Sequence, residues 1–313
     1  MKGLELSEKF YYEFGEPMIK EQFADIEQYL AVGLVGSGSE CLGFDDEISQ
    51  DHDFEPGFCI FIPEEEIIDS RKAFALERAY AKLPKEYMGF QRNALSPVGG
   101  NRHGVIRIDE FFKNKTGDEN ADITPEEWFM LDEQLVSEAT NGKIFCDNYG
   151  RMTFLRAKLS YMPDAVRLKK LAGNLLLMAQ SGQYNYTRCI TRGDTAAAQL
   201  AAVEFVNAAL RAVFLLNRKY MPYYKWTFRA LYELNNLNDL YETLEYLISS
   251  GNTADEAAKK QRAIEQVCSR IADEIRRQGI SGNKTDELEP LAYSVNDSIR
   301  DVHIRNLNIF YAV

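Results

Sequence analysis

Two aspartates on alternate residues, Asp51 and Asp53, are the side chains whose types and spacing point most clearly to chemistry. In an extended segment alternate side chains share one face, so both carboxylates would project together while His52 points the other way. Neighbouring carboxylate oxygens are ligands that suit Mg²⁺. The spacing therefore predicts a metal site built on this pair.

A glycine-serine turn, Gly38-Ser39, follows a short apolar run, and eleven residues separate it from Asp51. Backbone N–H groups in such a turn can hold phosphate oxygens. Gly36-Ser37 is a second candidate pair. We prefer Gly38-Ser39 because a further glycine, Gly43, then follows the serine after three residues. A triphosphate bridged by metal is the ligand that the turn and the aspartates would share.

This stretch resembles the nucleotidyltransferase superfamily of DNA polymerase β and kanamycin nucleotidyltransferase, in which a hydrophobic residue and a Gly-Ser pair precede Asp-x-Asp. The resemblance implies that Asp51 and Asp53 bind Mg²⁺, with two ions expected. It implies that Gly38 and Ser39 hold the β,γ-phosphates of an NTP, and we expect this NTP to be ATP. It also implies that the backbone at position 43 requires a glycine, Gly43. The implied reaction transfers NMP to a hydroxyl or amine of a small-molecule acceptor and releases pyrophosphate.

Members of this superfamily often carry a third carboxylate on a later strand, and Asp109 is the candidate metal-binding and catalytic residue here. It would share a strand face with Val105 and Arg107. The sequence IRIDEFF is equally compatible with the start of a solvated helix, so both alternatives stay open. Without a third carboxylate, activation of the acceptor is harder to explain. The alternative function is then a catalytically degenerate nucleotide-binding regulatory or scaffold protein.

Two later strings, GQYNYTRC at residues 182–189 and FLLNRKYMPYYKWTFRAL at residues 214–231, together resemble the bacterial family DUF4037, which has a nucleotidyltransferase-like N-terminal half. Within them, Lys225 and Arg229 lie on one predicted helix face beside aromatic side chains and are candidates for holding the triphosphate or a purine. Arg188 is a third candidate of the same kind. An amphipathic helix with solvated cations is the alternative reading of all three residues.

The predicted fold class is α+β, with a nucleotidyltransferase-like mixed sheet and flanking helices over residues 1–120 and an all-α helical bundle over residues 121–313. The polar segment at residues 112–122 favours this boundary. In the first part, strands are expected at residues 30–35, 50–54, 58–62 and 104–108, with a helix over 64–83. In the second part, a capping box at Thr124 predicts a helix over residues 124–140. Further helices are predicted at 164–180, 194–217, 223–237, 239–249, 253–278 and 286–302.

The composition limits the classes of partner. A net charge of −12 argues against nucleic acid, because holding its backbone normally requires a basic surface, whereas a protein acceptor is not excluded. The sequence shows no apolar run near the roughly 20 residues of a spanning helix and no signal peptide at its start, so we expect a cytoplasmic protein that is not in a membrane. Five cysteines without a CxxC spacing favour small core residues over disulfides.

Overall fold

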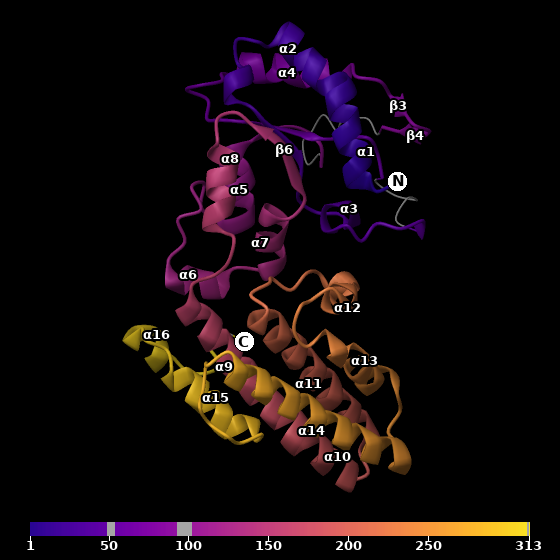
Figure 1. Cartoon of the computed structure of the whole chain (residues 1–313), viewed down its shortest axis with the longest axis vertical. Helices are drawn as coiled ribbons and strands as arrows, with labels where there is room; N and C mark the ends of the chain where they lie inside the picture. Colours follow the sequence, from indigo (N-terminus) through magenta and orange to yellow (C-terminus); the bar gives the residue numbers. More distant parts are fainter. Residues whose placement is uncertain (49–53, 93–101, 312) are drawn as a thin grey trace. The chain divides into compact units, whose positions relative to one another are not determined.

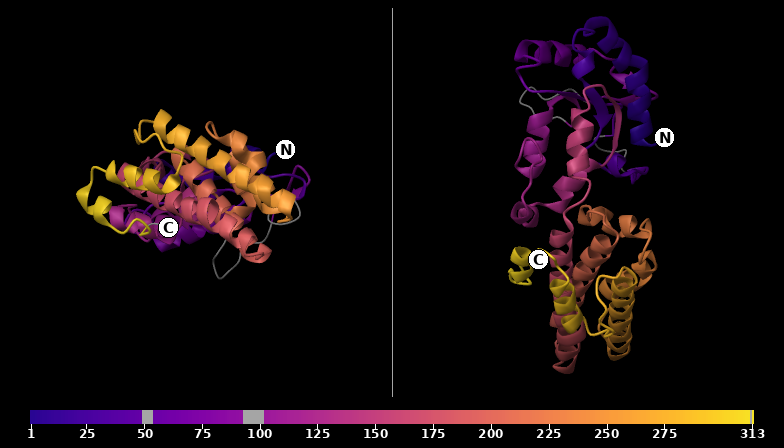
Figure 2. Two further views of the ribbon diagram at one scale, coloured as in Figure 1. Left: turned by 90° about the horizontal axis from the view of Figure 1, so that it is seen from below. Right: turned by 60° about the vertical axis from the view of Figure 1, so that its left-hand side comes forward.

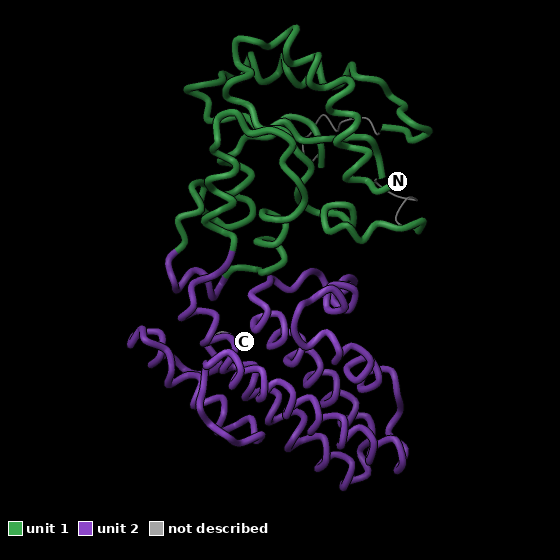
Figure 3. Tube along the Cα trace, viewed as in Figure 1, with its two compact units in different colours: residues 1–123, 131–160 green, residues 124–130, 161–313 purple. Residues whose placement is uncertain are grey.

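The computed structural model describes residues 1–48, 54–92, 102–311 and 313. It divides into two compact units, one formed by residues 1–123 and 131–160 and the other by residues 124–130 and 161–313 (Figure 3). The sequence analysis divided the chain near residue 120. The structure instead includes residues 131–160 in the first unit, because a strand in this segment, β6 (Lys143–Asp147), pairs with a strand of its sheet.

The first unit contains a mixed sheet in the order β5-β2-β1-β6, formed with β1 (Ala31–Leu34), β2 (Cys59–Ile62) and β5 (Gly104–Arg107). β1 is antiparallel to β2 and β6, and β2 is parallel to β5. Every residue of β1 and β2 is buried, as expected for strands covered on both faces. The strands predicted at 30–35, 58–62 and 104–108 are confirmed. The strand expected at 50–54 lies, except for Phe54, outside the described residues, and β6 was not predicted.

Helices cover both faces of this sheet (Figure 1). On one face, Val32, Ile60 and Ile62 pack in a single core with side chains of the N-terminal helices and α4. These are α1 (Gly3–Phe10), a π-helical segment (Tyr11–Gly15), α2 (Glu16–Gln22) and α4 (Ser70–Ala81). On the other face, Phe61 packs edge-on against Phe111 at 5.2 Å between ring centroids. That face carries α5 (Ile108–Thr116), α7 (Glu133–Thr140) and α8 (Arg151–Lys158).

Two local boundaries differ from those predicted. The helix expected from residue 64 begins at Ser70, because Asp69 caps it by accepting a hydrogen bond from the Lys72 N–H at 2.7 Å. The single helix expected over residues 124–140 is divided into α6 (Pro125–Met130) and α7, and Asp132 caps the start of α7. The other described elements of the first unit are a 3-10 helix (Glu27–Tyr29), a four-residue helix, α3 (Ser39–Leu42), and a short hairpin formed by β3 (Glu86–Tyr87) and β4 (Phe90–Gln91).

The described residues of the second unit form helices only, which confirms the predicted bundle. α9 and α11 pack side by side along their lengths, as do α9 and α15 (Figure 2). α11 is long and apolar enough to cross a membrane, but 61% of its most apolar window is buried inside the structure, as in the core helix of a bundle. After α6, the helical segments of the second unit are α9 (Asp164–Met178), a π-helical segment (Ala179–Tyr186), α10 (Thr187–Thr191), α11 (Thr195–Leu216), α12 (Tyr224–Tyr232), a 3-10 helix (Asn238–Leu240), α13 (Tyr241–Ser249), α14 (Ala254–Arg277), α15 (Leu288–Asp297) and α16 (Val302–Asn306).

Candidate functional site

Four chain segments converge at one end of the sheet. β1 ends beside the first residues of its antiparallel neighbours, since Gly33 pairs with Cys59 and Leu34 pairs with Lys143. β5 begins at the same level, since Gly104 pairs with Cys59. The segment after β1 therefore meets the segments before β2, β5 and β6. Segments that converge at one end of a rigid sheet are common positions for functional side chains.

The segment after β1, residues 36–43, is here called the glycine loop. Gly36, Gly38 and Gly43 have φ values of 112°, 124° and 75°, in the region that glycine adopts without steric cost. A Cβ atom at Gly38 would lie 2.0 Å from Nη2 of Arg102, so a side chain there is excluded. Gly43 ends α3 in the left-handed conformation with open space around its Cβ position. The end of this helix therefore explains the glycine at position 43.

Asn141 holds the start of the glycine loop and was not identified from the sequence. Its Oδ1 accepts a hydrogen bond from the Gly36 N–H at 2.9 Å, and its Nδ2 donates to the Gly36 carbonyl at 2.8 Å. Arg156 in turn donates from Nη2 to the carbonyls of Thr140 and Asn141, each at 2.7 Å. The sequence analysis used this asparagine only to end a helix. No local pattern marks it, because its partner is 105 residues away.

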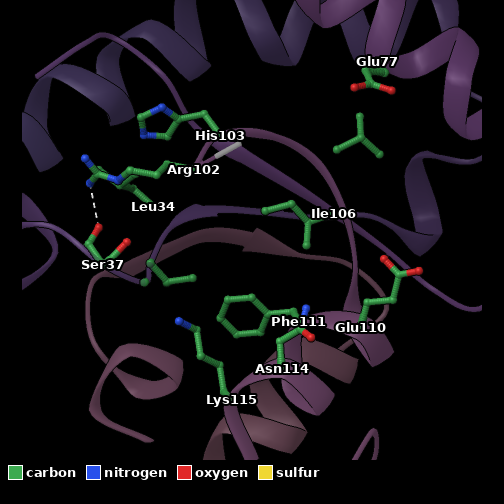
Figure 4. Close-up of a pocket in the computed structure, with 13 residues that line it drawn as sticks. Leu34, Ser37, Glu77, Arg102, His103, Ile106, Glu110, Phe111, Asn114 and Lys115 are labelled. Carbon is green, nitrogen blue, oxygen red and sulfur yellow. Dashed lines mark hydrogen bonds between the residues drawn. The ribbon is translucent and has the colours of Figure 1, made fainter. Parts of the chain in front are cut away.

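Arg102 is the cation beside the first residues of the glycine loop that the structure describes, and Lys2 lies at the other end, where its Nζ donates to the Gly43 carbonyl at 3.0 Å. Nη2 of Arg102 donates to the Ser37 carbonyl at 2.6 Å (Figure 4) and forms an ion pair with the carboxylate of Glu40. Glu40 is 7% exposed, so this pair is largely shielded from water. A guanidinium presents several N–H donors in one plane, which suits phosphate oxygens as well as carboxylates. Arg102 lies just before β5, and its position at the loop follows from strand pairing rather than from a sequence motif.

A cavity of about 430 Å³ opens beside the glycine loop. Figure 4 shows Ser37 and Arg102 on one side of it and the carboxylates of Glu77 and Glu110 on the other. Phe111 contributes to its floor, with apolar side chains of β1 and β5. One side of the cavity is therefore suited to anionic groups and the other to hydroxyl or amine groups. The complete lining is Leu34, Val35, Gly36, Ser37, Glu77, Arg102, His103, Val105, Ile106, Glu110, Phe111, Asn114 and Lys115.

The two cysteines near this end of the sheet do not supply a nucleophile. Burial raises the pKa of the Cys59 thiol to about 12, and its Sγ donates to the Arg102 carbonyl at 3.2 Å. Burial also raises the pKa of Cys41, a residue of α3. Both side chains stay protonated near neutral pH and act as small core residues, as the sequence analysis expected.

The preferred pair, Gly38-Ser39, is not among the residues that line the cavity, whereas the second candidate pair, Gly36-Ser37, is. Gly36 has no side chain, and Asn141 fixes its backbone. Ser37 is therefore the residue of the loop whose polar side chain lies at this wall of the cavity. Ser39 instead begins α3. The geometry thus moves the favoured phosphate-facing position from Gly38-Ser39 to Gly36-Ser37.

The predicted carboxylates have different outcomes. Asp51 and Asp53 lie outside the described residues. Asp109 does not occupy a strand, because α5 begins at Ile108, and its Oδ1 accepts a hydrogen bond from the Glu110 N–H at 2.8 Å. The helix alternative therefore holds, and Glu110 rather than Asp109 lines the cavity. Within the described part of the chain, no three His, Cys, Asp or Glu side chains converge as a metal site.

The three predicted cations of the second unit do not form one site. Arg188 of α10 lies over the ring of Tyr184 at 4.4 Å, and Lys225 of α12 lies 5.1 Å from the ring of Trp226. Arg229 lines a separate, shallow pocket on α12 and α13. α10 and α12 lie at opposite ends of α11 (Figure 1). A helix of this length is about 33 Å long, so Arg188 cannot share a triphosphate with the other two cations.

The comparisons with known proteins give a match to a family model over part of the chain and a similarity to a solved structure. A model of DUF4037, a domain of unknown function, matches residues 128–227. No curated protein matches the chain. A nucleotidyltransferase-like protein from Exiguobacterium sibiricum 255-15, known from a crystal structure, is similar over 91% of this chain and 89% of its own, with 11% identity and a TM-score of 0.37. The resemblance to DUF4037 is thus confirmed across residues 128–227, which include Asn141 but not the glycine loop.

Proposed function

We propose that the first unit binds a nucleoside triphosphate at the glycine loop and transfers its nucleotidyl group to a small-molecule acceptor in the adjoining cavity, with release of pyrophosphate. One observation carries this proposal. A glycine loop with a backbone that only glycine adopts easily is clamped by Asn141, faces Arg102, and opens on a cavity of about 430 Å³. This volume is within the range of small-molecule sites.

The phosphates are assigned to the side of the cavity formed by Ser37 and Arg102. Arg102 already binds one carboxylate, that of Glu40, together with a backbone carbonyl. Phosphate oxygens would meet the same donors and would compete with Glu40 for them. In such a site, the carboxylate of Glu40 neutralises Arg102 while no ligand is bound, and the phosphate takes the place of that carboxylate when the ligand binds.

Magnesium is assigned to Asp51 and Asp53. Two carboxylates on alternate residues form a hard oxygen donor set, and Glu55, two residues later in the sequence, is bonded to His103 at the wall of the cavity. When bound, the metal would supply positive charge against the triphosphate. Asp109 is not assigned to it, since its carboxylate accepts a hydrogen bond from the Glu110 N–H in the first turn of α5 and does not line the cavity.

The acceptor is assigned to the side formed by Glu77 and Glu110, where carboxylates are available to accept hydrogen bonds from hydroxyl or amine groups. Phe111 and the apolar ends of β1 and β5 would cover its carbon skeleton. The net charge of −12 disfavours a nucleic-acid acceptor.

A second candidate function is nucleotide binding without transfer, in a regulatory or scaffold protein. Two observations favour it: Asp109 does not supply a third carboxylate at the cavity, and Glu40 occupies the guanidinium of Arg102. The two functions share the phosphate site and differ in turnover.

The test measures Mg²⁺-dependent binding of ATP, GTP, CTP and UTP by calorimetry and pyrophosphate release against a pool of metabolites. The variant Asp51→Ala plus Asp53→Ala should lose binding and release. A matched control, Glu64→Ala plus Glu66→Ala, removes two acids of the same spacing beyond the cavity lining and should behave as the wild type. Equal binding by wild type and the aspartate variant would contradict the metal assignment. Binding without pyrophosphate release would favour the second function.

A further inference from the structure

A buried histidine-glutamate pair lies at the same end of the sheet. The Nδ1 atom of His103 is 2.7 Å from Oε1 of Glu55. His103 is 5% exposed, and the side chain of Glu55 is 12% exposed. Glu55 lies in the segment before β2 and His103 directly precedes β5, so the pairing of these two parallel strands brings the residues together across 48 positions of sequence.

The backbone before β2 is shaped around the imidazole. A Cβ atom at Gly57 would lie 2.5 Å from Nδ1 of His103, so a larger residue at that position would displace the imidazole. The ring is thus packed against the backbone and fixed by one hydrogen bond. A carboxylate accepts hydrogen bonds, so the ring proton belongs on Nδ1 and the lone pair on Nε2. This is the tautomer in which a histidine can take up a proton at Nε2.

The pair also lies where a base would be needed. His103 lines the cavity together with Arg102 and Ser37, and Figure 4 shows these side chains on the same side of it. The carboxylate that the sequence predicted for activating the acceptor, Asp109, instead accepts a hydrogen bond from the Glu110 N–H in the first turn of α5 and does not line the cavity. The cavity therefore has a candidate phosphate side but lacks the expected base, and an oriented imidazole is present at that side.

We propose that His103 is the general base for the acceptor and that Glu55 is its positioning residue, an inference that rests on the proposed nucleotidyl transfer. The acceptor oxygen bonds to the α-phosphorus while the bond from that phosphorus to the pyrophosphate oxygen breaks. The acceptor proton passes to Nε2 of His103, and pyrophosphate leaves with the electron pair of the broken bond. His103 then returns the proton to solvent. With water as the acceptor, ATP gives AMP and pyrophosphate.

The kinetic test uses each of the four NTPs with water as the acceptor and measures NMP and pyrophosphate. His103→Ala should lower turnover by about 10²–10⁴-fold. Its Kd for the NTP should match the wild type, and added imidazole should restore part of the rate. Glu55→Gln should slow turnover by about tenfold or more with the same Kd. His303→Gln is the matched control, because His303 is an exposed residue of α16 paired with Glu126 at 3.2 Å.

A spectroscopic test separates the pair itself from the reaction. The chain has three histidines, so a long-range ¹H–¹⁵N spectrum assigned with His103→Gln resolves the ring of His103. The expected result is a neutral ring protonated on Nδ1, and a proton on Nε2 instead would overturn the proposal. Full activity of a folded His103→Ala or His103→Gln protein, or a rate that imidazole leaves unchanged, would overturn the base role alone. No pyrophosphate release by the wild type with any NTP, either with water or with the metabolite pool as acceptor, would overturn the proposed function and the base role together.

Discussion

Charged side chains are buried in both units, but with different partners. At the sheet end of the first unit, the guanidinium of Arg102 is paired with the carboxylate of Glu40. In the core of the second unit, Lys169 and Lys260 are fully buried, and their hydrogen-bond partners are neutral oxygens. The first arrangement places opposite charges beside a cavity, and the second encloses single charges among helices.

The two arrangements suit different tasks. Lys169 donates to Asn296 Oδ1 at 2.8 Å and to the carbonyls of Arg305 and Leu307 at 3.0 and 2.5 Å, at the end of α16. Lys260 donates to the Ser250 carbonyl at the end of α13, at 2.8 Å. Terminal carbonyls of a helix lack intrahelical partners and carry partial negative charge, so these lysines tie helix ends to the bundle. A paired charge beside a cavity can instead exchange its partner for a ligand.

The largest predicted effect is on the stability of the second unit. Lys169→Met removes a donor from three part-buried oxygens, of which, among the residues that the structure describes, only the Arg305 carbonyl keeps a second donor, Asn296 Nδ2, and we expect the free energy of unfolding to fall by about 1–3 kcal/mol. Both tryptophans, Trp128 and Trp226, belong to this unit, so fluorescence in a urea titration reports it selectively. Lys219→Met is the control, because Lys219 is exposed in the same unit. A similar loss in the two variants would remove the structural role assigned to Lys169.

Next in size is the effect of loosening the glycine loop. Asn141→Ala removes both hydrogen bonds to Gly36, and we expect binding of Mg·NTP to weaken about tenfold, a change of about 1.4 kcal/mol. Calorimetry with the preferred NTP measures it. Asn148→Ala in the same unit removes one exposed hydrogen bond to the Glu27 carbonyl and should leave the affinity unchanged. Wild-type affinity in Asn141→Ala would show that the clamp does not organise the phosphate site.

A smaller effect of opposite sign is expected from the ion pair. Glu40→Gln removes a negative charge that would lie next to the proposed phosphates. The repulsion between two such charges about 4 Å apart is about 1 kcal/mol in water, which corresponds to about fivefold in affinity. We therefore expect tighter binding of Mg·NTP and of inorganic triphosphate. Glu5→Gln, an exposed residue paired with Lys9, is the control. Weaker binding by Glu40→Gln would indicate that Glu40 orients Arg102 instead of competing with the ligand.

The smallest effect concerns pH. Burial lowers the pKa of Lys169 and of Lys260. Between the lowered folded values and about 10.4, the value of an exposed lysine, the unfolded chain binds more protons, so stability rises with pH in that window. Below it both states are charged and these lysines contribute no slope. Urea midpoints followed by tryptophan fluorescence should rise less steeply toward pH 10 in Lys169→Met than in the wild type. Identical slopes would contradict the assigned pKa direction for Lys169.

The sequence by itself determined the elements that depend on near neighbours. Apolar runs predicted β1, β2 and β5, and a capping box at Thr124 predicted the start of α6. These signals are readable because both partners of each interaction lie within a few residues of one another, as Thr124 and Glu127 do. The α+β class followed from them. The glycine loop was found in the same way, although the pair preferred within it was not the one at the cavity.

Only the tertiary structure decided which residues meet at the cavity. β6 joins the sheet by pairing with a strand more than a hundred residues earlier, and this pairing brings Asn141 to Gly36. Arg102 reaches Glu40, and His103 reaches Glu55, through the pairing of β2 with β5. Contacts of this kind leave no spacing or periodicity in the sequence, because their geometry is set by strand register and not by neighbouring residues.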